Sequence, residues 1–389
     1  MTDIILTPAE ARARLIPSRE YVSCPVAFVD CRLPGSHLKR NYSMIGPGVT
    51  TAADQHVNLR EPHGFNIGAA GMPNGIVNNL HLHFTAEVFM TLRGKWTLRW
   101  GPNGDDGTFE ADEGAISSIP TWIFRGFTNT GPDDGWIFTT LGGDDTGGII
   151  WHPSVLARAA ETGLYIGADN ALIDTTTGAP VPAPADRLKP ITPEEIAALR
   201  RWTPAEMRKR VVTAEDRVWS DAALLDSCLP GCASAIAPVI GAGISQHRGH
   251  LAPLMDPHGF SMEWLRVPPG GSVSRFRIGA KMVLLAHRGE AEVVLNGPGH
   301  EVALPLAPLD MCSVPAGVWR AVRNTGSEAV ELLVMITGDG RKTPEWPAGT
   351  IAAARAANRA VDASGLIAPA HLLPDYAPGR QMAGEMETA

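Results

Sequence analysis

Most of the chain consists of short segments in which apolar and polar residues alternate, separated by Gly, Pro, Asn and Asp. Residues 89–114, FMTLRGKWTLRWGPNGDDGTFEADEG, show the pattern. Alternation with period 2 places one set of side chains on each face of a β-strand, and the breaks favour tight antiparallel turns. Many short strands of this kind predict a β-sandwich or a β-barrel.

One such segment, residues 78–94 (NNLHLHFTAEVFMTLRG), carries three side chains that can bind a metal. If it forms one strand, His81, His83 and Glu87 point to the same side, because side chains on a strand alternate. The opposite side then carries Leu82, Phe84, Val88 and Met90. We therefore expect one face to line a barrel interior and the other face to be covered.

Helices are expected only at the flanks of the strand-rich regions and between them. The motif Thr-Pro-x-Glu, which supplies a capping hydroxyl, a proline at the first helical position and a carboxylate at the third, starts at residues 7, 192 and 203. Alanine-rich stretches predict two further helices at 153–163 and 349–361. Residues 175–190, TTTGAPVPAPADRLKP, predict a proline-rich linker.

The two halves of the chain repeat each other at an offset of 195 residues. The tetrapeptide PHGF at 62–65 recurs at 257–260, and Asn-Thr-Gly at 129–131 recurs at 324–326. Single residues at the same offset include Gly94 and Gly289, Pro120 and Pro315, Arg125 and Arg320, and Trp151 and Trp346. Because the offset persists without an insertion, the chain is a tandem duplication.

We therefore predict an all-β protein with two tandem barrels and short flanking helices. The expected units are a first barrel with the metal site over residues 1–170, a linker with helices over 171–220, and a second barrel over 221–389. A length of 389 residues agrees with two domains, because a single core rarely grows that large. The second copy or another subunit would cover the outer apolar face, which favours a homo-oligomer.

Composition and charge exclude several classes of function. A net charge of −8 and a pI near 5.8, with no basic patch, argue against nucleic acid or an anionic membrane as the main partner. The N-terminal sequence does not resemble a secretory signal, and no apolar run is long enough to span a membrane. Five cysteines outside paired CxxC clusters favour reduced thiols. We expect a soluble, cytoplasmic protein that acts on a small molecule.

The three polar side chains of residues 78–94 have the chemistry of a transition-metal site. Two imidazoles and a carboxylate, from His81, His83 and Glu87, suit Fe(II), Mn(II), Ni(II) or Zn(II), whereas Ca or Mg would need mostly oxygen ligands. A carboxylate buried without a partner would be costly. The alternative is that both histidines are hydrogen-bonded core residues and that Glu87 pairs with a basic residue.

These residues resemble the first motif of the cupin superfamily, in which HxH is followed by Glu and then, after six intervening residues, by Gly. The matching positions are His81, His83, Glu87 and Gly94. The second cupin motif is matched in part, by Gly114, Pro120 and Asn129. Trp122 replaces a glycine of that motif, and Arg125 replaces the histidine that usually completes the metal site. The resemblance covers residues 45–150 and 240–345 and implies a bicupin with jelly-roll barrels.

The replacement by Arg125 changes the expected metal site. A protonated guanidinium has no lone pair, so it cannot be a ligand. The expected set is His81, His83 and Glu87, which leaves metal positions open for substrate and dioxygen. Arg125 has two interpretations: it orients an anionic substrate through bidentate hydrogen bonds, or it only ties strands together, as Arg320 would in the second copy.

The second copy lacks the ligands, because Phe276, Ile278 and Met282 occupy the three positions. Its barrel is expected to be structural. His63 is a candidate fourth ligand in the first barrel. Its counterpart His258 lies in the copy without ligands, which favours a structural role for His63. One metal-binding and one silent barrel resemble, in architecture, the bicupin ring-cleaving dioxygenases of the gentisate type.

Three functions follow from this pattern. The first is a non-haem metal-dependent dioxygenase, with Fe(II), that acts on a small organic acid or aromatic compound, with Glu87 as ligand and Arg125 as anion clamp. The second is an isomerase or lyase in which Glu87 or Thr85 assists proton transfer next to a carbonyl group. The third is a non-catalytic binding or storage-type bicupin. Trp96, Trp100 and Trp122 are expected either to form an aromatic wall of the substrate site or to pack in the barrel core.

Overall fold

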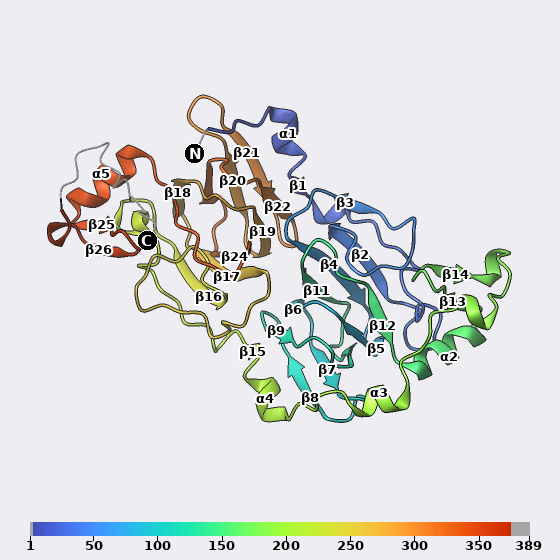
Figure 1. The fold of residues 1–389 in the computed structure, drawn as a ribbon. Coiled ribbons are helices and arrows are strands. Elements are labelled where there is room, and N and C mark those ends of the chain that lie inside the picture. Colours follow the sequence, from blue (N-terminus) through green and yellow to red (C-terminus); the bar gives the residue numbers. More distant parts are fainter. Residues whose placement is uncertain (1–2, 375–389) are drawn as a thin grey trace, which may run out of the picture.

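The computed structural model describes residues 3–374, so the end of the predicted second unit, residues 375–389, lies outside the described part. The first barrel combines a seven-stranded and a five-stranded sheet (Figure 1). The larger sheet has the order β15 (Val211–Val212), β9 (Ile116–Ile119), β6 (Glu87–Arg93), β11 (Gly135–Gly142), β4 (Phe65–Met72), β2 (Arg40–Ile45) and β3 (Val57–Leu59). The smaller sheet has the order β12 (Ile149–Trp151), β5 (Val77–His83), β10 (Arg125–Asn129), β7 (Trp96–Trp100) and β8 (Gly107–Ala111).

The second barrel combines a six-stranded and a four-stranded sheet. The six strands are β1 (Leu15–Ile16), β22 (Met311–Val314), β19 (Met282–Arg288), β24 (Val330–Thr337), β17 (Phe260–Val267) and β16 (Ala235–Ile240). The four strands are β18 (Ser272–Phe276), β23 (Arg320–Asn324), β20 (Ala291–Leu295) and β21 (Val302–Leu306). Nine strand pairs, from β2 and β16 to β11 and β24, begin 195 residues apart. The tandem duplication and the all-β fold are therefore confirmed.

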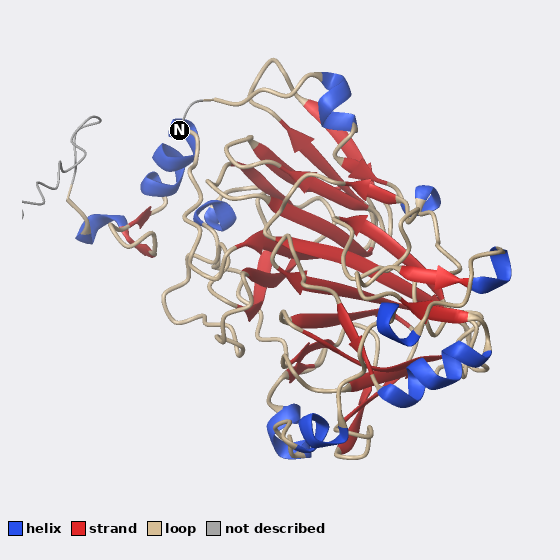
Figure 2. Ribbon diagram, turned by 45° about the vertical axis from the view of Figure 1, so that its right-hand side comes forward, coloured by secondary structure: helices blue, strands red, loops and turns tan. Residues whose placement is uncertain are grey.

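The helices lie at the periphery of the two barrels, as Figure 2 shows. All three Thr-Pro-x-Glu motifs form capping boxes and begin helices, which are α1 (Pro8–Arg12), α3 (Pro193–Ala197) and α4 (Pro204–Arg208). The alanine-rich stretches form α2 (Pro153–Glu161) and α5 (Ala348–Ala356). Both end earlier than predicted, because Gly163 and Asn358 adopt positive φ angles that stop a helix. None of the helices in the described part is long and apolar enough to cross a membrane.

Short elements complete the description. Two small hairpins pair β13 (Leu164–Ile166) with β14 (Leu172–Asp174) and β25 (Arg359–Val361) with β26 (Ile367–Pro369). Single 3₁₀ turns are η1 (Ser18–Glu20), η2 (Thr175–Thr177), η3 (Pro184–Asp186), η4 (Leu225–Cys228) and η5 (Ala370–Leu372). All five cysteines are free thiols.

The larger sheets of the two barrels pack face to face. One apolar cluster contains buried residues from both of them, so the second copy covers the outer face of β6. Of the two predicted covers, the second copy or another subunit, the structure shows the first. Polar contacts across this interface are reciprocal. Nε2 of His63 lies 2.7 Å from the hydroxyl of Ser313, and Nε2 of His258 lies 2.7 Å from the hydroxyl of Ser118. His63 therefore belongs to the interface between barrels.

Each repeat begins with an arm that packs on the other barrel, a feature that the sequence pattern did not reveal. The arms are TPAEARARLI at 7–16 and TPAEMRKRVV at 203–212. In the first arm, α1 contacts β21 and β1 pairs with β22. In the second arm, α4 contacts β8 and β15 pairs with β9. Both barrels are thus completed by residues from the opposite repeat.

Candidate metal centre

The three predicted ligands flank a bend between two sheets. His81 and His83 lie on β5, whereas Glu87 is the first residue of β6. The prediction of one continuous strand is therefore wrong. The chain bends at residues 84–86 so that β5 can pair with β10 and β12 while β6 pairs with β9 and β11. Nothing in the sequence marks this bend, because residues 84–86 include neither Gly nor Pro.

The bend brings the three side chains together inside the barrel. Their candidate ligand atoms all lie within 4.8 Å of one another, and all three residues are buried. Nε2 of His83 lies 3.5 Å from Oε1 of Glu87, and the two imidazole ring centres are 4.9 Å apart. The equivalent positions of the second barrel are filled by the buried apolar residues Phe276, Ile278 and Met282.

Both imidazoles are oriented through Nδ1. Nδ1 of His81 lies 2.7 Å from the carbonyl oxygen of Asn79, and Nδ1 of His83 lies 3.3 Å from that of Gly148. Because a carbonyl oxygen can only accept a hydrogen bond, each Nδ1 carries the proton and the lone pair of the neutral ring is on Nε2. Nε2 is thus the nitrogen that each ring offers to an ion.

Arg125 approaches Glu87 from the start of β10. Its Nε and Nη2 each lie 2.9 Å from Oε2 of Glu87, which leaves Oε1 facing the histidines. Nη1 also donates to the carbonyl oxygen of Ile123 at 3.0 Å. In the second barrel Arg320 donates to the equivalent carbonyl, that of Val318, at 2.8 Å. The contact between the arginine and a loop carbonyl is therefore common to both barrels. The contact with the carboxylate of Glu87 is found in the first barrel. Through Glu87, Arg125 joins β10 to β6, which agrees with the interpretation that it ties strands together. Its action as an anion clamp stays a prediction.

The electrostatics favour the protonation states that a metal ion needs. Burial lowers the pKa of His81 well below its usual range, and the charges of His83 and Arg125 act in the same direction. Burial and Arg125 also lower the pKa of His83. For Glu87, burial is the largest influence and would raise the pKa, but the charge of Arg125 and the contacts with His83 and His81 together outweigh it and keep the pKa well below its usual range. Two neutral imidazoles therefore face an ionised carboxylate at neutral pH.

A small pocket opens in front of these groups. It has a volume of about 70 Å³ and includes all three candidate ligands in its lining. Hydroxyl and amide side chains from β2, β11 and the loop 46–56 also line it, namely Asn41, Ser43, Thr50, Gln55 and Thr139. Nothing in the sequence pattern distinguishes these lining residues from other strand and loop positions.

The three tryptophans lie in different surroundings. Trp96 and Trp100 are buried in an apolar cluster inside the first barrel. Trp122 is 47% exposed and stacks edge to face on Phe84, with ring centres 5.3 Å apart. Its φ of 56° is the left-handed conformation that explains the glycine of the cupin motif at this position. None of the three lines the pocket in the part of the chain that the structure describes.

The donor set fits a divalent transition metal. One candidate ligand atom from each of the three residues lies within 4.8 Å of the other two, and Nδ1 of each ring has its own acceptor, as is usual for metal-bound histidines. The alternative in which Glu87 pairs with a basic residue is realised at the same time. The two are compatible because Arg125 uses Oε2 and leaves Oε1 to an ion.

Comparisons with known proteins agree with this architecture. No protein-family model and no curated protein sequence match the chain. Among solved structures, Lactobacillus farciminis oxalate decarboxylase in a formate complex has a TM-score of 0.54 and 10% identity and covers 91% of both chains. Momordica charantia 7S globulin has a TM-score of 0.52, 12% identity and 86% coverage of both chains, and vicilin from Solanum melongena has 0.54, 12% and 87%. Likeness at this identity shows the fold alone. The chain therefore has the bicupin fold, two cupin barrels in tandem, as its sequence motifs implied.

Proposed function

We propose that the first barrel is the active site of a divalent-metal-dependent enzyme that acts on a small carboxylic acid. His81, His83 and Glu87 would hold the metal. The observation that carries this proposal is the convergence of these three donors on a buried pocket in one barrel, with apolar side chains at the same positions of the other. A barrel that only packed would not need to bury such groups, because burying polar groups without a ligand or partner is costly.

The size of the pocket supports a small aliphatic acid rather than an aromatic compound. Its volume is about 70 Å³. An apolar cavity that binds benzene measures roughly 150 Å³, about twice as much. The amide of Asn41 and the hydroxyl of Thr139 line the pocket and offer hydrogen bonds to a carboxylate.

Redox-neutral lyase chemistry is the reaction class that we favour. The similar oxalate decarboxylase was solved as a formate complex, so the same fold holds a small acid there. A bound divalent metal would supply Lewis-acid polarisation of the substrate carboxylate. Arg125 would keep Glu87 ionised, and the carbonyl groups of Asn79 and Gly148 would hold both imidazoles in the ligand tautomer. For proton transfer, Glu87 lines the pocket, whereas Thr85 is not among the described lining residues.

A dioxygenase using Fe(II) is the second candidate. The observation that favours it is the set of two histidines and one carboxylate, to which residues 3–374 add no fourth ligand, because that set leaves metal positions for both substrate and dioxygen. Dioxygen dependence separates the two classes. The lyase should turn over fully under nitrogen, and the dioxygenase should consume oxygen in proportion to substrate.

Metal content is the first experiment. Protein purified without chelators or a histidine tag should contain about one equivalent of a transition metal per chain, which elemental analysis would also identify among iron, manganese, nickel and zinc. His83→Ala should lose that metal, and Met282→Ala, at the position of Glu87 in the second barrel, should keep it. Two-carbon to four-carbon acids are then tested for carbon dioxide release and oxygen uptake. Metal-free wild-type protein that cannot be loaded would support the non-catalytic alternative instead.

We also propose that the protein forms a homo-oligomer. Large apolar side chains remain exposed on the single chain, at Val218 (70%), Leu251 (66%) and Met255 (54%). Exposed apolar surface of this kind favours association with another copy. Light scattering should give a mass above the 41.4 kDa of one chain.

A further inference from the structure

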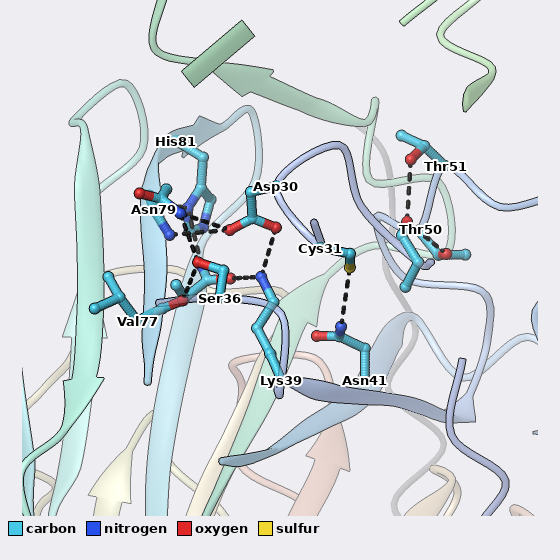
Figure 3. Close-up of polar contacts among 12 residues, drawn as sticks. Asp30, Cys31, Ser36, Lys39, Asn41, Thr50, Thr51, Val77, Asn79 and His81 are labelled. Atoms are coloured by element: carbon cyan, nitrogen blue, oxygen red, sulfur yellow. Dashed lines mark hydrogen bonds and ion pairs between the residues drawn. The ribbon is translucent and has the colours of Figure 1, made fainter. Parts of the chain in front are cut away.

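A buried ion pair lies directly behind His81. Lys39 and Asp30 belong to the segment that leads into β2, and their charged atoms are 2.7 Å apart with both side chains fully buried (Figure 3). Moving two such charges out of water costs several kcal/mol per ion before their attraction is counted. Since apolar residues could replace the pair at little cost, stability alone does not explain it.

Asn79 connects this pair to His81. Lys39 donates to Oδ1 of the neighbouring Asn78, and the amide nitrogen of Asn78 lies 3.2 Å from Nδ1 of His81. Because an amide nitrogen can only donate and this Nδ1 already carries a proton, that contact is not a hydrogen bond. Asp30 accepts from the backbone N–H of Asn79 at 3.2 Å and from its side-chain amide at 3.1 Å. The carbonyl oxygen of Asn79 is then the acceptor for Nδ1 of His81. The connection from Lys39 to His81 therefore runs through Asp30 and Asn79.

The ammonium group does not reach the substrate pocket. Nζ of Lys39 lies 5.3 Å from the ring centre of Phe28 and 5.9 Å from that of Trp151. Both rings line the pocket, whereas Lys39 is not among its described lining residues. Any effect of Lys39 on the site must therefore pass through its neighbours.

The second barrel keeps one half of this arrangement and lacks the other. Asp226 stands at the position of the aspartate and accepts from the backbone N–H of Ser274 at 2.6 Å. The positions of the lysine and of Asn78 hold Ser234 and Val273. The aspartate contact thus belongs to the fold of both repeats. The lysine and the amide occur in the barrel that carries the candidate ligands.

We propose that Lys39 is a positioning residue of the metal centre: it holds Asp30, and Asp30 fixes Asn79, whose carbonyl oxygen keeps the proton of the His81 ring on Nδ1 so that the ring presents Nε2 to the ion. This inference rests on the proposed metal site. In metal-binding proteins, loss of a partner behind a ligand typically weakens metal affinity about 10-fold to 100-fold. We expect a loss in that range when Lys39 is removed.

The test measures affinity for Co(II), by competition with a chromophoric chelator, together with the visible absorption spectrum of bound Co(II). Two variants break the connection at different points: Lys39→Met removes the ammonium, and Asn79→Ala removes the side-chain amide that donates to Asp30 while the ion pair stays. A matched control is Arg32→Met, which removes another cation of the same segment, one paired with Asp174 at 2.7 Å. The double variant Asp30→Asn/Lys39→Met covers the case in which the single lysine variant fails to fold.

Lys39→Met and Asn79→Ala should each weaken Co(II) binding about 10-fold or more and shift the spectrum. Combining them should add little, because both act through His81. The control should stay within about 3-fold of wild type. If wild-type protein binds Co(II) and both variants bind it equally well with the same spectrum, Lys39 does not position the site. If wild-type protein binds no metal, the proposed function itself fails.

Discussion

The contact between Glu87 and Arg125 gives a quantitative prediction. Both side chains are almost completely buried, with 4% and 1% exposure. Charges about 4 Å apart attract by roughly 4 kcal/mol at an effective dielectric constant near 20. Removing one partner of a buried pair typically costs about 3 to 5 kcal/mol, because the other charge stays buried without compensation. We therefore expect metal-free Glu87→Gln and Arg125→Met to lose about 3 kcal/mol of unfolding free energy each.

The double variant distinguishes this reasoning from ordinary packing loss. Glu87→Gln/Arg125→Met leaves no uncompensated charge, so it should be more stable than the sum of the single losses predicts, by about 2 kcal/mol or more. Guanidinium unfolding in the presence of a chelator, followed by tryptophan fluorescence, measures all four proteins. Single losses that are below about 1 kcal/mol, or that add up in the double variant, would refute a strong buried ion pair.

Three further predictions concern pH and metal. Burial raises the pKa of Glu263, in the second barrel, to about 7. The folded state therefore loses stability as pH rises from about 4.5 to 7. Chemical unfolding should show Glu263→Gln to be more stable than wild type by up to about 3 kcal/mol at pH 8 and equally stable at pH 4. Burial lowers the pKa of His63; stability should therefore fall as pH drops below about 6.5, and His63→Gln should show a smaller fall in thermal scans. A free metal concentration 100-fold above Kd should add about 2.7 kcal/mol, so a chelator should lower the Tm of wild type but not of His83→Ala.

The repeat and the ligand motif were sufficient to predict the fold and the candidate metal ligands. A constant offset of 195 residues placed equivalent strands in both halves, because many matching positions support the same alignment. The capping boxes marked helix starts, because each one depends on four neighbouring residues. The bend after His83 was not predictable, since residues 84–86 continue the apolar pattern of a strand. The pairing of Lys39 with Asp30 also escaped prediction, because loop residues show no periodicity that reports burial.

The two arms give a different kind of information about the origin of the chain. An edge strand without its neighbour presents unpaired backbone groups and tends to recruit another chain. A precursor with only one repeat would have lacked a partner for that edge, which in this chain is closed by β1 or β15 from the opposite repeat. The reciprocal contacts of His63 with Ser313 and of His258 with Ser118 are those of a twofold interface. Two copies of a single repeat that exchanged arms would make these same contacts as a homodimer. The edge and the interface therefore place equal demands on both copies, although the candidate ligands stand in the first copy.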